Sequence, residues 1–315
     1  MPPARASNEG ASNTGGSDTP GLKPGPNLGL TPELIARLDR LAFRSRRNVV
    51  GSGAGQRLSP RPGTSAEFSD FRTYVAGDDY RRLDWNAYAR LDRLLLRLYL
   101  GEEDLSVHLF VDVSASMRYG RPPKDAAAVR IAGALAYVGL AGLDRVAVTG
   151  FADRVTTSTR PLRGRQSCPR LWSALAGLGS GTDTDYSCLG AVAARLRPGI
   201  SVILSDFLTA SDPAPALAAL RSRGQQVVLL QVLAPQEIDP DVAGDVALTD
   251  VETGARVEVT VTPAVLDRYR GELAEQTARL EGLARAHGAL WHRIRSDQPV
   301  DLLVMDTFRR IGLLS

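Results

Sequence analysis

The feature that most constrains this 315-residue chain is the alternation of short apolar runs with longer helical stretches in its C-terminal two thirds. The runs that have the length and composition of buried strands are 105–113, 145–151, 200–205, 225–233 and 289–295. The segments between them are long enough for helices of ten or more residues. Because parallel strands are joined by such crossover helices, the pattern predicts an α/β fold: a mostly parallel sheet with helices on both faces.

Two local patterns add predictions about strand pairing and burial. Residues 94–100 (LLLRLYL), a polar turn and the apolar run at 105–113 predict a β-hairpin. The longest apolar stretch, 131–143, has 13 residues between Arg130 and Asp144, whereas a membrane-spanning helix needs about 20. This stretch therefore predicts a buried helix and no membrane span.

The composition divides the chain into three parts. Residues 1–27 contain five glycines, five prolines and three serines and almost no large aliphatic side chain, which predicts a disordered tail. Thr31 followed by Pro32 is typical of a helix start, so a short amphipathic helix is expected there. We assign residues 28–104 to an N-terminal segment packed on the sheet and residues 105–315 to the α/β domain.

The charge balance is too even to indicate a partner. Lys and Arg total 38 against 35 Asp and Glu, a net charge of +3, and just two of the basic residues are lysines, Lys23 and Lys124. Arginines between 37 and 61 could contact nucleic acid, but the sequence around them matches no nucleic-acid-binding fold. We therefore expect no nucleic-acid partner.

Cysteine and histidine are too few and too scattered to form a zinc finger or a disulfide framework. The residues concerned are Cys168, Cys188, His108, His287 and His292. The N-terminus opens MPPARASNEG, which has no apolar region typical of a signal peptide. These features predict a cytoplasmic protein in a reducing compartment.

Oxygen-bearing side chains follow several of the predicted strands at the point where each strand ends. Asp112, Ser114 and Ser116 come directly after the first run, and Asp206 follows the run at 200–205. Thr182 lies in the polar loop before the helix expected near Cys188, and a slip of one position in that loop would exchange it for Thr184. Ligands of such sheets gather at the carboxyl ends of the strands, and oxygen ligands suit Mg²⁺ or Mn²⁺. The sequence therefore predicts a metal site.

The order Asp-x-Ser-x-Ser, Thr and Asp resembles the metal-ion-dependent adhesion site of von Willebrand factor type A domains, a Rossmann-like fold. In that resemblance Asp112, Ser114, Ser116, Thr182 and Asp206 are the metal ligands. The upstream stretch from GQRLSPRPG to LYLGEED resembles bacterial domain-of-unknown-function family 58, whose genes often lie near those of MoxR-type AAA+ ATPases. The likeness runs from about Leu34 to the C-terminal FRRIGLL.

The resemblance implies a non-enzymatic adaptor whose metal grips an acidic residue of a partner. The implied partner is a MoxR-type AAA+ ATPase or its client, and the implied role is chaperone-like assembly or maturation of other proteins. The alternative is a metal-dependent hydrolase that uses the same crevice. Against it, the sequence contains neither a GxxxxGK[ST] phosphate loop nor a GxSxG nucleophile motif.

A mixed-charge cluster in the N-terminal segment is a second candidate site. Its candidate docking residues are Asp78, Asp79, Arg81, Asp84, Trp85 and Arg90. The simpler interpretation is a network of ion pairs that fixes this segment in place. The sequence leaves both interpretations open.

Overall fold

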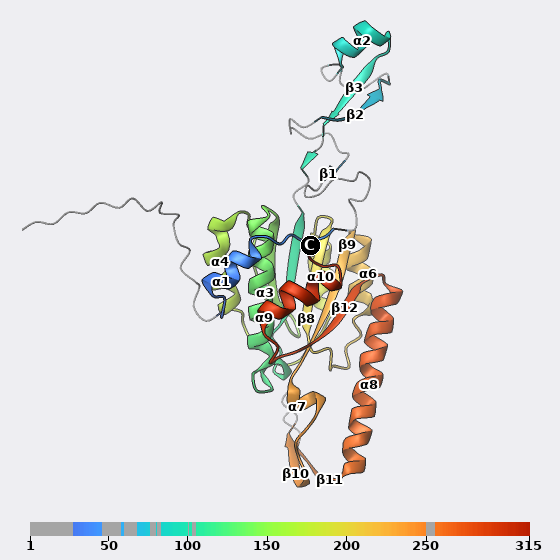
Figure 1. The fold of residues 1–315 in the computed structure, drawn as a ribbon. Coiled ribbons are helices and arrows are strands. Elements are labelled where there is room, and N and C mark those ends of the chain that lie inside the picture. Colours follow the sequence, from blue (N-terminus) through green and yellow to red (C-terminus); the bar gives the residue numbers. More distant parts are fainter. Residues whose placement is uncertain are drawn as a thin grey trace, which may run out of the picture.

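The computed structural model describes residues 28–45, 58–59, 68–75, 80, 83–99, 101–102, 105–249 and 256–315. Its centre is a six-stranded sheet in the order β12-β9-β8-β5-β6-β7 (Figure 1). These strands are β5 (Ser106–Asp112), β6 (Arg145–Phe151), β7 (Val155–Ser158), β8 (Gly199–Ser205), β9 (Gln225–Leu233) and β12 (Leu290–Arg295). β7 runs antiparallel to β6, and every other neighbouring pair is parallel. The predicted mostly parallel sheet is confirmed.

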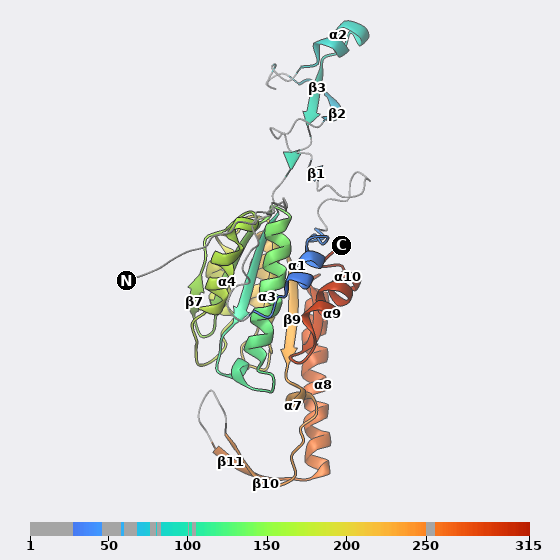
Figure 2. The same ribbon diagram turned by 60° about the vertical axis from the view of Figure 1, so that its left-hand side comes forward.

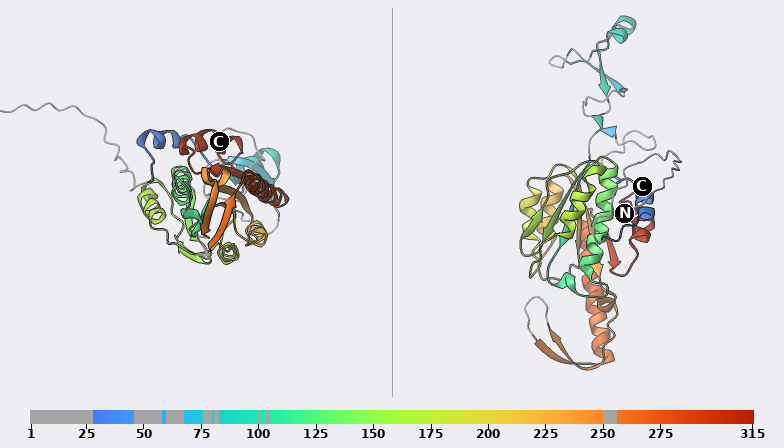
Figure 3. Two further views of the ribbon diagram at one scale, coloured as in Figure 1. Left: turned by 90° about the horizontal axis from the view of Figure 1, so that it is seen from below. Right: turned by 90° about the vertical axis from the view of Figure 1, so that its left-hand side faces the viewer.

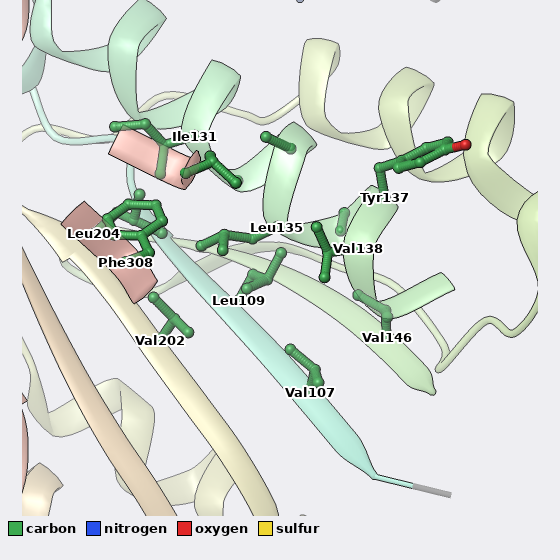
Figure 4. Packing of buried hydrophobic residues seen from close by; sticks show 14 of the residues in the cluster. Val107, Leu109, Ile131, Leu135, Tyr137, Val138, Val146, Val202, Leu204 and Phe308 are labelled. Carbon is green, nitrogen blue, oxygen red and sulfur yellow. The ribbon is translucent and has the colours of Figure 1, made fainter. Parts of the chain in front are cut away.

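Helices cover both faces of the sheet (Figure 3). One face carries α3 (Lys124–Ala141) and α4 (Cys168–Ala176), and the other carries α5 (Ser187–Ala193), α6 (Ala214–Ser222) and α8 (Pro263–Ala286). Alternate residues of β5 serve the two faces: Leu109 and Val111 belong to the larger apolar core, and Phe110 belongs to the second core. Figure 4 shows how Leu109 packs beneath α3 in the larger core.

Helix α3 is the most deeply buried helix of the larger core, and its sequence explains why. It is apolar on all sides, so it suits a position between the sheet and other helices rather than at the surface. Ile131, Leu135 and Val138 are buried in the larger core, as the apolar stretch at 131–143 predicts. In the described part of the chain, no helix has the length and apolarity to cross a bilayer.

The first described residues pack on the same face as α3, together with the last ones. Helix α1 (Pro32–Leu38) begins as predicted, with the Thr31 side chain accepting a hydrogen bond from the Leu34 backbone NH. Leu38 and Phe43 are buried in the larger core, and Phe43 forms an antiparallel bridge with Leu314. The C-terminal elements beside them are α9 (Val300–Leu302), η5 (Leu303–Thr307) and α10 (Phe308–Arg310).

The described elements between residues 58 and 102 stand away from the sheet, beyond the N-terminal ends of its strands (Figures 1 and 2). The described elements of this arm are β1 (Leu58–Ser59), β2 (Phe68–Thr73), α2 (Trp85–Leu91), β3 (Leu95–Tyr99) and β4 (Gly101–Glu102). Of the predicted segment 28–104, residues 28–45 therefore pack on the sheet, whereas β2, α2 and β3 extend from it. Residues 1–27, predicted to be a disordered tail, lie outside the described residues.

The predicted hairpin between 94–100 and 105–113 is wrong. β3 pairs antiparallel with β2, while β5 lies at the centre of the sheet between β6 and β8. Because both edges of β5 are taken by parallel neighbours, no edge is left for β3. The two runs therefore belong to different sheets and do not pair with each other.

A second projection lies at the opposite end of the sheet (Figures 1 and 2). It consists of the antiparallel pair β10 (Gly244–Thr249) and β11 (Arg256–Val261), which follows the short helix α7 (Pro235–Ile238). The remaining single turns are η3 (Ser116–Arg118) and η4 (Arg165–Ser167). The strand exits that carry the candidate site therefore lie at the end of the sheet that faces α7, and the arm lies at the other end.

Candidate metal centre

The candidate site lies where the sheet changes winding direction. From β5 the chain passes through α3 to β6 on one side, whereas β8 is the neighbour of β5 on the other side. At such a switch point the loops that leave adjacent strands diverge and open a crevice. Asp112 ends β5, and Asp206 follows the last residue of β8, so the two predicted carboxylates share this crevice.

Asp112 is fully buried and both of its carboxylate oxygens accept hydrogen bonds. Oδ1 accepts one from the Ser114 backbone NH at 2.9 Å, and Oδ2 accepts one from Ser205 Oγ at 2.6 Å and one from Thr184 Oγ1 at 3.1 Å. Burial, and then the charge of Asp206, raises the pKa of Asp112 to about 6, although the bonds from Ser205 and Ser114 oppose this rise. The ionised carboxylate thus lacks a full countercharge of its own.

The hydroxyl groups of Ser114 and Ser116 lie side by side at the same loop. Their Oγ atoms are 3.0 Å apart; Ser114 is buried and Ser116 is half-buried. Adjacent oxygens of an octahedral Mg²⁺ shell are about 3 Å apart, because each lies about 2.1 Å from the ion at right angles. The two hydroxyls therefore have a separation that suits neighbouring ligands of one small cation.

The loop between α4 and α5 brings Thr184 to Asp112 and leaves Thr182 at the surface. Thr184 is buried against the carboxylate, while the Thr182 side chain is exposed and its backbone carbonyl accepts a hydrogen bond from Ala115 NH at 3.1 Å. Gly181 makes this approach feasible, since a Cβ atom there would lie 2.1 Å from the Cβ of Ala152. Of the two threonines left open by the sequence, Thr184 is the one whose hydroxyl contacts Asp112.

Asp206 is held by a buried lysine that the sequence analysis did not assign to the site. Lys124 Nζ lies 2.7 Å from Asp206 Oδ2 and also forms an ion pair with Glu237 Oε1. The Lys124 side chain has no exposed surface, and the Glu237 side chain is 12% exposed. Burial alone would lower the pKa of Lys124, but the two carboxylates outweigh it and the pKa is raised, so the ammonium stays charged.

Ser205 and Tyr186 form a further layer beneath Asp112. Ser205 Oγ, besides donating to Asp112, lies 2.9 Å from the Tyr186 hydroxyl and accepts from the Phe207 backbone NH at 3.1 Å. Phe207 has φ 56°, a left-handed conformation that costs a non-glycine residue about 1–2 kcal/mol. Stacking of its ring on Tyr186, with centroids 5.5 Å apart, helps to hold the turn that presents Asp206.

The donor set of the crevice fits a hard divalent cation. In the described residues no group of three or more His, Cys, Asp and Glu side chains could hold a metal ion. The crevice offers oxygen instead: the carboxylates of Asp112 and Asp206 and the hydroxyls of Ser114, Ser116 and Thr184. Carboxylate and hydroxyl oxygens are ligands that suit Mg²⁺ and Mn²⁺, whereas zinc sites favour sulfur and imidazole.

A groove of about 460 Å³ opens beside Ser114. Val129 and Leu178 contribute apolar surface to it, Arg118 and Arg130 contribute guanidinium groups, and Asp125 contributes a carboxylate. Among the described residues neither arginine forms an ion pair. The groove beside Ser114 therefore combines apolar contact area with two arginines and one carboxylate, a net positive charge.

The described members of the candidate docking cluster, Asp84, Trp85 and Arg90, lie in the arm, far from this crevice (Figure 1). Asp84 caps α2, its Oδ1 accepting hydrogen bonds from the backbone NH groups of Asn86 at 2.9 Å and Ala87 at 3.0 Å. Trp85 is 61% exposed and Arg90 is exposed as well. Asp78, Asp79 and Arg81 lie outside the described residues.

Residues 70–279 match the family model described as "Protein of unknown function DUF58". The chain belongs to this family. It is 30% identical over 296 residues to uncharacterized protein Rv1480 of Mycobacterium tuberculosis, covering 90% of this chain and 92% of the relative. Uncharacterized protein Mb1516 of Mycobacterium bovis matches with the same identity and coverage.

Similarity to solved structures is more distant. The conserved hypothetical protein BatB from Bacteroides thetaiotaomicron has a TM-score of 0.42 and 14% identity, over 66% of this chain and 98% of that one. Proximal thread matrix protein 1 from the mussel byssus, in a structure with a zinc-occupied MIDAS motif, has a TM-score of 0.34 and 13% identity, over 41% and 38% of the two chains. At these scores nothing about the ligands of this chain follows from them.

Proposed function

We propose that this protein is a non-enzymatic, metal-dependent adaptor that binds a carboxylate of a partner protein through an Mg²⁺ or Mn²⁺ ion. The donor set of the crevice is the observation that carries the proposal. Asp112 would be a direct ligand, with the hydroxyls of Ser114 and Ser116 beside it. Hydroxyl ligands are neutral, so the ion retains affinity for a further carboxylate, which it can take in place of a water molecule.

The groove beside Ser114 supports a protein as the ligand. Its apolar surface and its two arginines, Arg118 and Arg130, would contact side chains on either side of the acidic residue that reaches the ion. Charge-assisted bonds to arginine favour an acidic partner segment. We propose a MoxR-type AAA+ ATPase or its client as the partner, in chaperone-like assembly or maturation of other proteins, because of the resemblance to family 58.

We place this activity in the cytoplasm. Cys168 and Cys188 are both free thiols, which is consistent with a reducing compartment. Burial raises the pKa of Cys168 to about 12 and of Cys188 to about 11, so neither thiol is activated for chemistry.

We propose the adaptor over the hydrolase alternative because His108, the histidine of the central strand, is not placed to act as a general base in the crevice. A hydrolase would need a general base within hydrogen-bond reach of the attacking water. His108 lies inside the sheet, with Nε2 bonded to Thr149 Oγ1 at 2.8 Å, and burial lowers its pKa to about 4. We therefore expect no Asp112-dependent hydrolysis of a phosphoester or a peptide by the isolated protein.

The first experiment titrates Mn²⁺ into the wild-type protein and the Asp112→Ala variant by calorimetry or by paramagnetic relaxation. Loss of the direct carboxylate should weaken Mn²⁺ binding by tenfold or more, while Ser114→Ala, which removes one neutral oxygen, should weaken it less. Asp306→Ala is the matched control, since Asp306 is an exposed aspartate in η5, paired with Arg310 and outside the crevice. Equal affinity of wild type and Asp112→Ala would refute the metal site.

The second experiment measures binding of the candidate AAA+ protein with Mg²⁺ and with EDTA. Metal and partner should strengthen each other's binding reciprocally, by a coupling of about 1–3 kcal/mol, or 5- to 150-fold in affinity. The nucleotide state of the ATPase is controlled separately because ATP also binds Mg²⁺. If partner binding depends neither on the metal nor on Asp112, the interface lies outside the crevice.

A further inference from the structure

The ion pairs of Lys124 join three separate parts of the crevice. Lys124 begins α3, which follows the Ser114 loop, while Asp206 follows β8 and Glu237 lies in α7 after β9. All three side chains are buried or nearly so. A buried ammonium between two carboxylates offsets charge that would otherwise repel across the crevice.

Glu237 is itself fixed by other contacts. Its Oε2 accepts a hydrogen bond from the Ala234 backbone NH at 2.7 Å, and its backbone carbonyl accepts one from the Tyr269 hydroxyl at 2.7 Å. These two bonds fix the position of Glu237, and Glu237 in turn holds the Lys124 ammonium against Asp206. The oxygen of Asp206 that faces Lys124 is occupied by this bond.

We propose that Lys124 is a built-in counter-cation that stabilises the crevice without metal and keeps its affinity for divalent ions low. This inference rests on the proposed metal site. In it Lys124 is a positioning residue: it holds Asp206 by an ion pair and competes with a metal ion for the charge of that carboxylate. A partner's carboxylate would then add the charge that favours metal binding, which couples the two events.

The expected size of the effect follows from charge and distance. An ion near Asp206 would lie roughly 5 Å from an ammonium that is 2.7 Å from the same carboxylate. At the dielectric constant of water, the repulsion between a divalent and a single positive charge at roughly 5 Å weakens binding about tenfold. Removal of the ammonium should therefore tighten metal binding by about tenfold or more.

The test titrates Mn²⁺ alone into the full chain carrying Lys124→Met, Glu237→Gln or both changes. We expect Lys124→Met to bind Mn²⁺ about tenfold more tightly and to gain more in Tm from Mn²⁺ than the wild type does. A residue with a merely structural role would instead weaken metal binding when it is removed. Arg165→Met is the matched control, because it removes a positive charge that is ion-paired with an aspartate, Asp39, outside the crevice, and it should change the affinity by less than about twofold.

The double variant keeps the test decisive if Lys124→Met does not fold. Lys124→Met with Glu237→Gln removes one charge of each sign and leaves the net charge unchanged. Tighter Mn²⁺ binding by this variant would therefore show the effect of releasing Asp206 from its ion pair with Lys124. We expect it to bind Mn²⁺ at least about threefold more tightly than the wild type, and Glu237→Gln alone to bind more weakly.

The outcomes separate this inference from the proposed function. Asp112-dependent binding by the wild type, with no gain in the double variant, would overturn the role of Lys124 and leave the metal site in place. An absence of Asp112-dependent binding in every protein tested would overturn the metal site itself. Tighter binding in the double variant that Asp112→Ala abolishes supports both.

Discussion

The buried histidine of the central strand makes the stability of this protein depend on pH. His108 lies in β5, 6% exposed, with its ring stacked on Phe110 at a centroid distance of 4.4 Å and Nε2 bonded to Thr149 Oγ1 at 2.8 Å. Burial lowers its pKa from 6.5 to about 4. Between these two values the unfolded chain binds a proton that the folded protein excludes, so the contribution of His108 to stability falls as the pH drops from about 6.5 towards 4. Asp112, whose pKa is raised to about 6, contributes with the opposite sign, so the effect of His108 is read from the difference between the wild type and a His108 variant.

The magnitude follows from the linkage between proton binding and folding. With a pKa of 6.5 in the unfolded chain and about 4 in the folded one, lowering the pH from about 7 to about 4.5 should cost about 2–3 kcal/mol at this residue. Burial also lowers the pKa of His292, which adds a contribution of the same sign. The assay is urea unfolding at a series of pH values, with the wild type compared with His108→Gln.

His108→Gln should lose about 2 kcal/mol of the pH dependence in this interval, whatever its stability near neutral pH. His287→Gln is the control, since His287 caps the end of α8 outside the sheet, and it should retain the wild-type slope. Parallel curves for the wild type and His108→Gln between about pH 4 and 6.5 would refute the reasoning, because they would show that His108 protonates equally in both states.

Two further predictions test the crevice loop and the packing of α3. Thr184→Val should lower the free energy of unfolding by about 1.5–3 kcal/mol, because it removes the hydrogen bond to Asp112. Thr182→Val, at an exposed side chain, should change it by less than about 0.5 kcal/mol. Urea unfolding of both variants checks this, and the reverse order would contradict the loop geometry. Gly139→Ala should lower stability by about 1–3 kcal/mol, because the new Cβ would lie 2.6 Å from Val146 Cγ2. Gly190→Ala in α5 should raise stability by about 0.5–1 kcal/mol, because a Cβ there has nothing within 4 Å and alanine favours a helix. Thermal unfolding of both variants distinguishes the effect of packing from that of helix propensity.

The sheet was predictable from the sequence because strands that are buried on both faces need apolar residues at almost every position. β5, β8 and β9 are almost wholly buried, and their near-continuous apolar runs are typical of parallel strands covered on both sides. The pairing of β3 was not predictable in the same way. Apolar runs separated by a short polar turn resemble a hairpin locally, and only the parallel neighbours of β5 exclude it.

Within the site, residues at strand exits could be found and residues that arrive from elsewhere could not. Asp112 and Asp206 follow apolar runs, so topology alone brings them together. Lys124 lies on a helix and Glu237 follows a different strand, so their meeting depends on tertiary packing. A signal did exist for Lys124, since it is one of two lysines in a chain whose other basic residues are arginines.

Loop geometry determines which of the two threonines contacts Asp112. Thr182 and Thr184 are separated by one residue, and sequence spacing does not say which hydroxyl turns inward. The close approach of Gly181 to Ala152, and the hydrogen bond from Ala115 to the Thr182 carbonyl, decide it in favour of Thr184.

The pairing of residues 42–44 with residues 313–315 has a consequence for biosynthesis. Ser315 NH donates to the Ala42 carbonyl, and Arg44 NH donates to the Leu313 carbonyl, so this contact joins residues about as far apart in the chain as any described pair. On the ribosome, α1 and Phe43 emerge first but find this partner only after the rest of the sheet has been made. Until then, apolar side chains such as Leu38 and Phe43 lack part of their final cover. The nascent chain should therefore stay exposed to aggregation and to chaperone capture until its last residues have been made.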